Sequence, residues 1–303
     1  MRGTRFIASA ATASIAPVRL SGMSNFSASR AVFRALHSQG CFVIPNPWDQ
    51  GTAKYLRYLG FHALATTSGG FAFSRGLPDA DWAVARDEML AHIAEIVRAT
   101  DLPVNADFES GYADNPEQVA ENVLACINTG VAGLSIEDNT GKSSAPLYDL
   151  PLAVERIQAA RAAIDISDSG VLLTARAECY LVGHPDPFRE SLRRLQAYAA
   201  AGADVLYAPG VSNRDEIQAI VSAVAPKPVN ILVGVNTRLR VADLAAMGVR
   251  RVSVGSALAR SAWAGFIAAA TEIAEHGTFG GFERTVPFAE LNAFFKKETA
   301  AGK

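Results

Sequence analysis

The segment Gly130-Val-Ala-Gly-Leu-Ser-Ile-Glu137 joins a glycine to a short run that is rich in β-forming residues. Glycine suits the left-handed position just past a helix, and such runs are typical of buried parallel strands. The same pattern recurs in segments that begin at Gly60, Gly202 and Gly248. The intervals between the four glycines fit six strand–helix units of about 30 residues, the size of a βαβ repeat. Internal repetition of this kind decides the fold class.

The remaining strands lie before and between these repeats. Four further β-rich runs occupy residues 42–47, 104–109, 171–178 and 229–234. Helical patterns occupy residues 82–100, 116–129, 152–164, 187–201, 213–224, 241–247 and 257–276. Eight strands that alternate with helices predict an α/β protein with a single (β/α)8 barrel of the TIM type. An open doubly wound sheet is the alternative, and it is disfavoured because no GxGxxG motif follows the first strand.

The two ends of the chain lie outside this barrel, which we place at residues 23–277. Residues 1–22 contain three arginines and no acid, so we interpret them as a disordered leader or the result of a start codon assigned too early. A transit peptide to the mitochondrial matrix is the competing interpretation. Residues 278–303 form a C-terminal tail with a predicted helix at 288–295, which we expect to pack on the barrel or on a neighbouring subunit.

Composition and charge narrow the partners and the compartment. The chain has 28 basic and 30 acidic residues, a net charge of −2, which indicates no basic surface for nucleic acid. No uninterrupted apolar run reaches the roughly 18 residues of a membrane-spanning helix. The three cysteines form no CxxC pair, which argues against a disulfide framework and a zinc cluster. We therefore expect a cytoplasmic protein that binds neither nucleic acid nor membrane.

Polar residues gather at the predicted carboxyl ends of consecutive strands, where barrel enzymes place their active sites. The third strand ends in Asp107 and Glu109, whose side chains should point the same way because the side-chain period of a strand is two. The fourth strand ends in Glu137 and the fifth in Arg176. Several carboxylates at one rim repel one another, and oxygen ligands without His or Cys suit Mg²⁺ or Mn²⁺. Each acid could instead cap a helix or pair with Arg176.

Two further groups at this rim indicate an anionic ligand. The planar guanidinium of Arg176 can hold two carboxylate oxygens, although a structural salt bridge is its alternative role. Ser68-Gly69-Gly70 either offers a hydroxyl and backbone N–H groups to an anionic head group or is an ordinary flexible loop. A Schiff-base aldolase and a zinc hydrolase are disfavoured, because no lysine lies within a predicted strand and no histidine ends one.

With these residues the chain resembles the isocitrate lyase/phosphoenolpyruvate mutase superfamily, over residues 40–260. The segments that carry the resemblance are SGG at 68–70 with GLPD at 76–79, ADFESGYADNP at 106–116, SIEDN at 135–139, TARAE at 174–178, VNILVG at 229–234 and MGVRRVSVGS at 247–256. The resemblance implies a Mg²⁺-dependent (or Mn²⁺-dependent) enzyme that acts on a small carboxylic acid through an enolpyruvate-like intermediate. It also implies a homotetramer, often with exchange of the last helix between subunits.

The resemblance further implies roles for particular residues. The metal-linked acids are Asp107, Glu109 and Glu137. The substrate-binding residues are Ser68, Gly69, Gly70, Arg176 and Asn230. The catalytic residues are Asp79, Arg176 and Glu137, with Asp79 near the bond that breaks.

The loop after Glu137 departs from the superfamily pattern. Lyases of the superfamily carry Lys-Lys/Arg-Cys-Gly-His there, with the cysteine as acid or base, whereas this loop reads NTGKSSAPLY from Asn139 to Tyr148. Isocitrate or methylisocitrate cleavage by the usual route is therefore disfavoured. Phosphonomutases carry Lys-x-Asn-Ser in this loop, to which Lys142, Ser143 and Ser144 are only faintly similar, and these three are the candidate gating residues.

The leading functional hypothesis is a Mg²⁺-dependent C–C lyase or decarboxylase. Its substrate is a small α-keto or α-hydroxy diacid such as oxaloacetate, because this chemistry needs only carboxylate binding, a metal and a stabilised enolate. The second hypothesis is P–C bond chemistry, as a phosphoenolpyruvate/phosphonopyruvate mutase or hydrolase. The third is a metabolite-binding barrel without catalysis.

Overall fold

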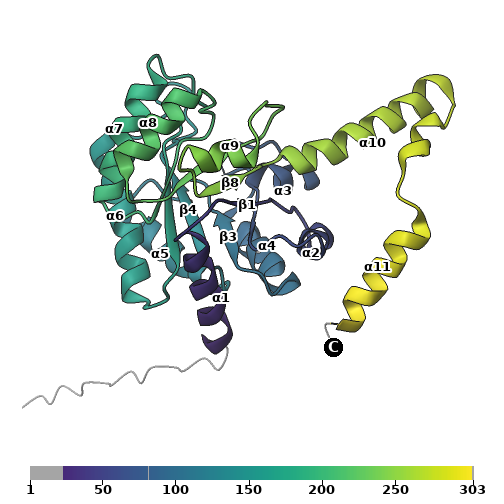
Figure 1. Cartoon of the computed structure of the whole chain (residues 1–303), viewed down its shortest axis with the longest axis horizontal. Coiled ribbons are helices and arrows are strands. Elements are labelled where there is room, and N and C mark those ends of the chain that lie inside the picture. The colour runs from purple at the N-terminus through teal and green to yellow at the C-terminus, as the bar shows by residue number, and fades with distance from the viewer. Residues whose placement is uncertain (1–22, 81, 302–303) are drawn as a thin grey trace, which may run out of the picture.

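The computed structural model describes residues 23–80 and 82–301, and within them eight parallel strands form one sheet (Figure 1). The strands are β1 (Phe42–Ile44), β2 (Leu64–Ala65), β3 (Val104–Asp107), β4 (Gly133–Glu137), β5 (Leu172–Arg176), β6 (Val205–Tyr207), β7 (Val229–Leu232) and β8 (Arg251–Ser253). Consecutive strands pair from β2 to β8, and β8 pairs with β1. At the remaining seam the Ala65 amide donates to the Pro45 carbonyl (3.0 Å). The predicted (β/α)8 barrel is confirmed.

Helices follow the strands and surround the sheet (Figure 1). They are α1 (Met23–Leu36), α2 (Gln50–Tyr58), α3 (Ser68–Ser74), α4 (Arg86–Ala99), α5 (Pro116–Ile127), α6 (Leu150–Ile166), α7 (Pro187–Ala200), α8 (Arg214–Val224), α9 (Val241–Ala246), α10 (Ala257–His276), the 3-10 helix η1 (Gly280–Arg284) and α11 (Phe288–Ala301). The helices from α4 to α11 lie at predicted positions, and α10 has the predicted bounds. The sequence patterns did not predict α1, α2, α3 or η1.

Polar residues before the helices fix where several of them begin. The Asn115 side chain accepts from the Glu117 amide (2.8 Å), and Pro116 takes the first helical position of α5. A proline suits this position because its missing N–H would be unpaired there in any residue. Thr67 plays the capping role for α3, since its hydroxyl accepts from the Gly70 amide (3.1 Å). The turn after β2 is therefore the start of a helix.

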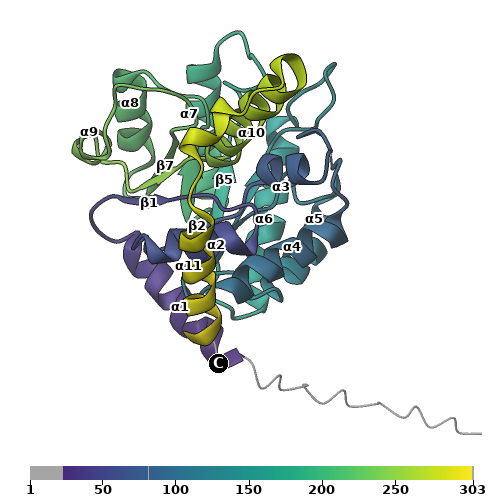
Figure 2. The same ribbon diagram turned by 90° about the vertical axis from the view of Figure 1, so that its right-hand side faces the viewer.

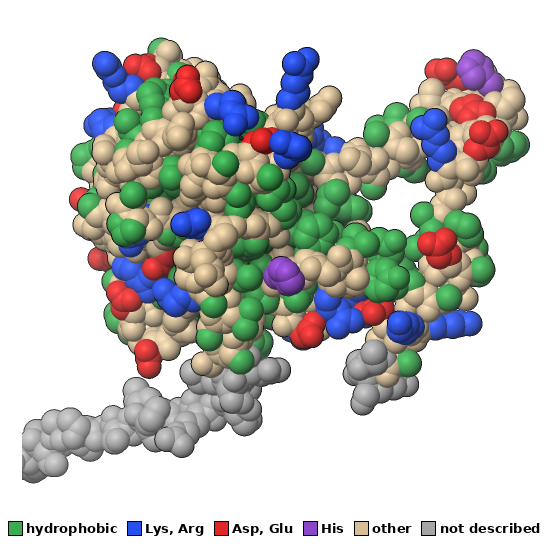
Figure 3. Space-filling model, in the orientation of Figure 1, with side chains coloured by type: hydrophobic (Ala, Val, Ile, Leu, Met, Phe, Trp, Pro, Cys, Tyr) green, Lys and Arg blue, Asp and Glu red, His purple; other side chains and the backbone are tan. Residues whose placement is uncertain are grey.

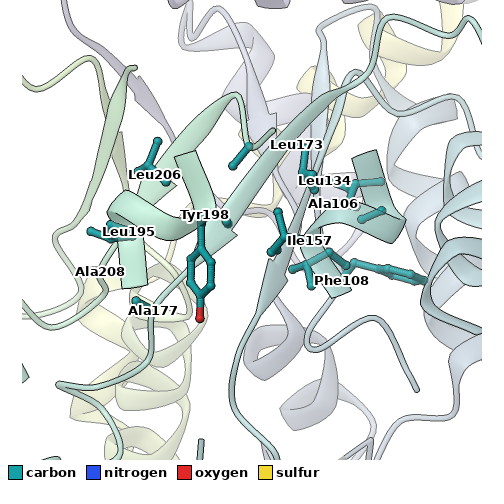
Figure 4. Packing of buried hydrophobic residues seen from close by; sticks show 14 of the residues in the cluster. Ala106, Phe108, Leu134, Ile157, Leu173, Ala177, Leu195, Tyr198, Leu206 and Ala208 are labelled. Atoms are coloured by element: carbon teal, nitrogen blue, oxygen red, sulfur yellow. The ribbon is translucent and has the colours of Figure 1, made fainter. Parts of the chain in front are cut away.

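The hydrophobic core lies between the sheet and the surrounding helices (Figure 4). Outward-facing strand residues and helix residues form one buried cluster, which includes Ala106, Leu134, Leu173, Leu206, Ile157, Leu195 and Tyr198. Because side chains alternate along a strand, the neighbouring residues point into the barrel. Several of these are polar and buried, namely Asn105, Ser135, Thr174, Asn230 and Arg251. A polar interior is unusual for this fold, whose barrels are ordinarily filled with branched apolar residues.

The C-terminal segment leaves the barrel and returns to it. Helix α10 projects outward and α11 runs back along the molecule (Figures 1 and 2). The Phe294 ring packs against Tyr55 and Tyr58 of α2, with ring centroids 5.1 and 5.3 Å apart, and Arg57 pairs with Glu298 at 2.5 Å. The tail helix thus contacts α2 of its own barrel, and its packing on a neighbouring subunit stays a prediction. The boundaries drawn at residues 22/23 and 277/278 stay predictions.

The interpretation of residues 1–22 as a leader concerns a segment that lies outside the described residues. Within the described ranges, no helix has both the length and the apolar character needed to cross a membrane.

Candidate active site

A cavity of about 200 Å³ opens at the carboxyl ends of the strands, where the sequence predicted the site. The charged side chains in its wall are Asp79, Asp107, Arg176 and Arg251. Ser68, Gly69 and Asn230 also line it, so the structure brings together six of the predicted site residues in one cavity. Glu109 and Glu137 do not belong to its described wall.

Arg176 is the centre of charge in this cavity. Its Nη1 donates to Asp107 Oδ1 (2.7 Å) and lies 3.0 Å from Glu137 Oε2, while its Nε donates to Glu178 Oε1 (2.9 Å). Burial alone lowers the pKa of Arg176, but the charges of Glu137, Glu178 and Asp107 raise it well above its ordinary value. The alternative role weighed for Arg176, a salt bridge at the rim, is therefore present in the structure. Its binding of a substrate carboxylate stays a prediction.

The Ser68-Gly69-Gly70 segment is the first turn of α3 rather than a flexible loop. The Ser68 amide and hydroxyl both donate to Asp107 Oδ2, each at 3.1 Å. The Gly70 amide donates to the Thr67 hydroxyl (3.1 Å). The two Ser68 donors are therefore engaged with Asp107, whose carboxylate lines the cavity. The role of Ser68, Gly69 and Gly70 in binding an anionic substrate stays a prediction.

Glu109 lies two residues beyond Asp107, the last residue of β3. Glu109 has a φ of 46°, in the left-handed region, and Tyr112 has a φ of 55°. This turn directs the Glu109 carboxylate to the Tyr112 hydroxyl (2.7 Å) and the Trp82 amide (3.4 Å). Burial, aided by the charges of Asp107 and Asp79, raises the pKa of Glu109 to about 7. The expectation that the side chains of Asp107 and Glu109 point the same way stays a prediction. Strained backbone of this kind clusters at functional sites.

Glu137 is the last residue of β4, and Glu178 lies two residues after the end of β5. Both carboxylates contact the guanidinium of Arg176. Burial raises the pKa of both carboxyls, and the guanidinium of Arg176 opposes that rise. Glu178 is held in place by Asp138, whose Oδ1 accepts from the Glu178 amide (2.8 Å). The other oxygen of Asp138 accepts from Arg194 (2.9 Å) and from the Tyr198 hydroxyl (2.5 Å), both on α7. Asp138 therefore positions the acid that orients Arg176.

Asp79 also lines the cavity, close to the start of α3. A Cβ atom added to Gly69 would lie 2.5 Å from Asp79 Oδ2, so any other residue at position 69 would force this carboxylate to move. Burial, and next the charge of Asp107, raise the pKa of Asp79 above its ordinary value. A carboxyl whose neutral form is favoured can donate a proton. The structure thus places Asp79 in the cavity, while its predicted catalytic role is untested.

The loop that follows β4 does not reach the cavity. A two-residue antiparallel bridge joins Asn139 to Leu147, and Lys142 pairs with Asp114 at 3.4 Å on an exposed surface. Ser143 and Ser144 are exposed as well. None of the three candidate gating residues belongs to the cavity wall described. The gating role of Lys142, Ser143 and Ser144 stays a prediction.

Arg251 and Tyr207 are cavity residues that the analysis of the sequence missed. The Tyr207 ring centroid lies 5.2 Å from Arg176 Cζ, and Tyr207 follows Arg176 in the register of β5 and β6. Arg251 is the first residue of β8, whereas the sequence analysis considered only residues at the carboxyl ends of the strands. A usable signal was present, because a charged pair, Arg250-Arg251, is out of place in a buried parallel strand.

The donor set suits a hard divalent cation. Within residues 23–80 and 82–301, no group of three or more His, Cys, Asp or Glu side chains is arranged to hold a metal ion, so the predicted set of Asp107, Glu109 and Glu137 stays a prediction. Mg²⁺, however, keeps several waters and takes only one or two carboxylates from a protein. Asp107 and Asp79 present such carboxylates to the cavity. The acids around Arg176 also outnumber it, an imbalance that a cation would relieve.

Comparison with known proteins identifies the family. The family model of phosphoenolpyruvate phosphomutase matches residues 33–274. An oxaloacetate decarboxylase of Pseudomonas entomophila (strain L48) is 31% identical over 236 residues, which cover 75% of this chain and 78% of that protein. The structure of a provisionally assigned lyase/mutase from Burkholderia cenocepacia J2315 is similar with a TM-score of 0.86 and 48% identity, over 90% of this chain and 97% of the other.

A second solved structure, of oxaloacetate acetylhydrolase with its product oxalate, has a TM-score of 0.78 and 27% identity, over 92% of this chain and 99% of the other. The family model spans most of the chain, and both structures align along nearly their whole length. The chain therefore belongs to the phosphoenolpyruvate phosphomutase family, within the isocitrate lyase/phosphoenolpyruvate mutase superfamily of lyases and mutases.

Proposed function

We propose that this protein is a divalent-metal-dependent lyase that cleaves a C–C bond in a small α-keto or α-hydroxy diacid, with oxaloacetate as the model substrate. The observation that carries the proposal is the small polar cavity in which Arg176, Asp107 and Asp79 meet at the strand ends. Its volume of about 200 Å³ suits an acid of a few carbons. The similarity to an oxaloacetate decarboxylase and to oxaloacetate acetylhydrolase supports the same substrate class.

The metal proposed for this site is Mg²⁺ or Mn²⁺. Asp107 would hold it on the cavity side, with Glu109 and Glu137 as the further metal-linked acids. When bound, the cation supplies Lewis-acid polarisation of the substrate oxygen and neutralises the excess of carboxylate charge.

The side chains of the cavity account for the rest of the reaction. Arg176 binds the substrate carboxylate through the part of its guanidinium that faces the cavity, while Glu137 and Glu178 keep the group charged and oriented. Cleavage leaves the electron pair of the broken C–C bond on an enolate, which a nearby positive charge stabilises. Asp79, whose carboxyl lines the cavity, would return a proton to the enolate carbon. Asn230, at the inner wall, completes the substrate site.

P–C bond chemistry is the second candidate function. Phosphonopyruvate resembles oxaloacetate in size and carries one more charge, and the family model is that of a phosphomutase. It is placed second because the residues that would gate a phosphoryl group, Lys142, Ser143 and Ser144, lie outside the cavity wall, with Lys142 paired to Asp114. A barrel that binds a metabolite without turning it over is the third candidate, and it would be favoured only by inactivity toward every keto acid.

We also propose that the chain forms a homo-oligomer, with a tetramer as the expected state. Apolar side chains gather near the outward arm of α10 (Figure 3). Trp263, Phe266 and Ile267 on this helix are 39, 62 and 55% exposed. Neighbouring exposed apolar side chains of this kind are typical of a protein–protein interface. The proposed partners are otherwise a carboxylic acid and a metal, not nucleic acid or membrane. The cytoplasm is the proposed compartment, in keeping with the unpaired thiols of Cys41, Cys126 and Cys179.

The test is a substrate screen with matched variants. Purified protein is incubated with oxaloacetate, phosphonopyruvate or a substituted malate in the presence of Mg²⁺, and the products are quantified before and after addition of EDTA. We expect oxaloacetate turnover that EDTA abolishes and that Asp107→Asn reduces at least about 100-fold. Asp101→Asn, the same change at an exposed aspartate, serves as the control and should leave the rate unchanged.

Each other outcome has a defined meaning. Turnover that persists in EDTA would remove the metal from the proposal, and a wild-type rate for Glu137→Gln would remove that residue from the site. Turnover of phosphonopyruvate alone would establish the second function in place of the first. If Lys142→Ala left that turnover untouched, the loop after β4 would have no role in it.

A further inference from the structure

Arg251 is a buried cation without a carboxylate partner. Its side chain is 3% exposed and lines the cavity from the inner end. Its Nε donates to Asn230 Oδ1 (2.8 Å), its Nη2 donates to Thr174 Oγ1 (3.1 Å), and its Nη1 lies 3.5 Å from His37 Nε2. No ion pair joins it to an acid among the described residues. A charge buried in this way is costly unless a partner neutralises it.

The groups around Arg251 do not supply that partner. Burial, together with the charge of Arg251, lowers the pKa of His37 to about 3, so this imidazole is neutral at physiological pH. Asn230 and Thr174 are neutral as well. The guanidinium is thus held by neutral acceptors that orient it without cancelling its charge. Arg176 differs, because its charge is met by three carboxylates.

The barrel geometry brings the two arginines into one cavity. Cα partners in adjacent strands run from Glu137 to Arg176, Tyr207, Asn230 and Arg251. This row begins at the last residues of β4 and β5 and finishes at the first residue of β8, because the strands of a barrel are staggered. The Tyr207 ring lies beside the guanidinium of Arg176. The Tyr207 hydroxyl accepts a hydrogen bond from the Ser253 hydroxyl (3.4 Å). The Ser253 hydroxyl in turn accepts from the Asn230 side-chain amide (2.9 Å). Arg176 therefore marks the rim of the cavity and Arg251 its inner end.

We propose that Arg251 binds a second anionic group of the substrate, so that the cavity selects small acids with two acidic groups, one at Arg176 and one at Arg251. This inference rests on the proposed function for the identity of the site and for its diacid substrate, and it adds the residue that binds the second acidic group. The second group is a carboxylate or a phosphonate, since both offer oxygens to a guanidinium. Acids with a single charged group would leave Arg251 buried and unpaired, and they should bind less tightly.

Calorimetric titration of the metal-loaded protein tests this with three inert acids. Malonate carries two carboxylates, phosphonoacetate carries a carboxylate and a phosphonate, and propionate is a monoacid of the same chain length as malonate. In the wild type, malonate or phosphonoacetate should bind at least tenfold more tightly than propionate, which is about 1.4 kcal/mol at 25 °C. The tighter of the two identifies the second group. Equal affinity for the three acids would overturn the inference without any variant.

Variants at two adjacent arginines complete the test. Arg251→Met should raise the Kd of the preferred diacid at least tenfold and that of propionate less than twofold, while Arg251→Lys should fall between. Arg250→Met is the matched control, because Arg250 lies one residue away and donates to the Gly40 carbonyl at an exposed position. It should change neither Kd. Equal losses for the diacid and propionate, or no loss for Arg251→Met, would overturn the inference.

These measurements separate the inference from the proposed function because binding needs no turnover. An inactive protein that prefers diacids through Arg251 would contradict the lyase proposal alone. An active lyase that binds malonate, phosphonoacetate and propionate equally would contradict the role of Arg251 alone.

Discussion

The substitution Glu109→Gln tests the electrostatics of the candidate site through its effect on stability. Burial is the main cause that raises the pKa of Glu109 to about 7, and the charges of Asp107 and Asp79 add to it. Glutamine has nearly the same shape and its amide oxygen can still accept from the Tyr112 hydroxyl. The substitution therefore removes the ionisation while it keeps the principal contact of this side chain.

The expected magnitude follows from the two pKa values. Between the ordinary 4.5 and about 7, at about 1.36 kcal/mol for each pKa unit, the difference amounts to about 3 kcal/mol. The folded state has the raised pKa, so the favourable contribution of Glu109 is fully present below pH 4.5 and is lost as the pH rises through 7. Glutamine suffers no such loss. The variant should match the wild type near pH 4.5 and be more stable by about 3 kcal/mol at pH 8.5.

Urea unfolding of the metal-free protein in EDTA measures this difference at both pH values. Glu155→Gln, the same change at an exposed residue of α6, is the control and should show no pH-dependent gain. A gain for Glu109→Gln of equal size at pH 4.5 and pH 8.5 would refute the reasoning, because it would not come from ionisation. A loss at pH 8.5 would show that the charged form of Glu109 is the one the folded protein stabilises.

Three further predictions concern the stability of the fold. Asp138→Ala should lower the free energy of unfolding by about 3–5 kcal/mol, because it removes the buried carboxylate that accepts from Arg194 and Tyr198, and a loss below 1 kcal/mol in urea titrations would contradict this. Gly265→Ala should raise it by about 0.5–1 kcal/mol, since its position within α10 is open and alanine favours a helix. Gly70→Ala should lower it, since the new Cβ would lie 2.6 Å from Thr67 Cγ2. In thermal unfolding, the melting temperature should rise for Gly265→Ala and fall for Gly70→Ala.

The fold could be predicted from the sequence because its signals are local and repeated. A glycine past a helix followed by a short apolar run marks β4, β6 and β8, and the structure has left-handed glycines at Gly130, Gly202 and Gly248. The short helices escaped prediction because they carry other signals. Helix α3 begins with Ser-Gly-Gly, a composition typical of loops, and only the Thr67 cap and packing against its surroundings make it helical.

Site residues could be predicted from the sequence where the end of one strand is enough to fix their position. Asp107 and Arg176 close their strands, so their place at the rim followed from the fold class. Strand alternation is a weaker guide for Glu109, because it holds only while the strand continues, and the left-handed turn after β3 brings the Glu109 carboxylate into contact with Tyr112 and Trp82. No periodicity in the sequence contains those contacts.

Arg251, at the inner end of the cavity, shows why part of the site could not be predicted from the sequence. Arg251 begins its strand, yet the stagger of the barrel sets it in one row with Arg176, which ends its own. That relation depends on how eight strands close on one another, so it exists only in the assembled sheet. A rule that searches strand ends finds the acids and the arginine of the rim. It passes over the residue whose uncompensated charge distinguishes one class of substrate from another. Substrate specificity in this barrel is therefore expected to follow from the register of the sheet as much as from the loops above it.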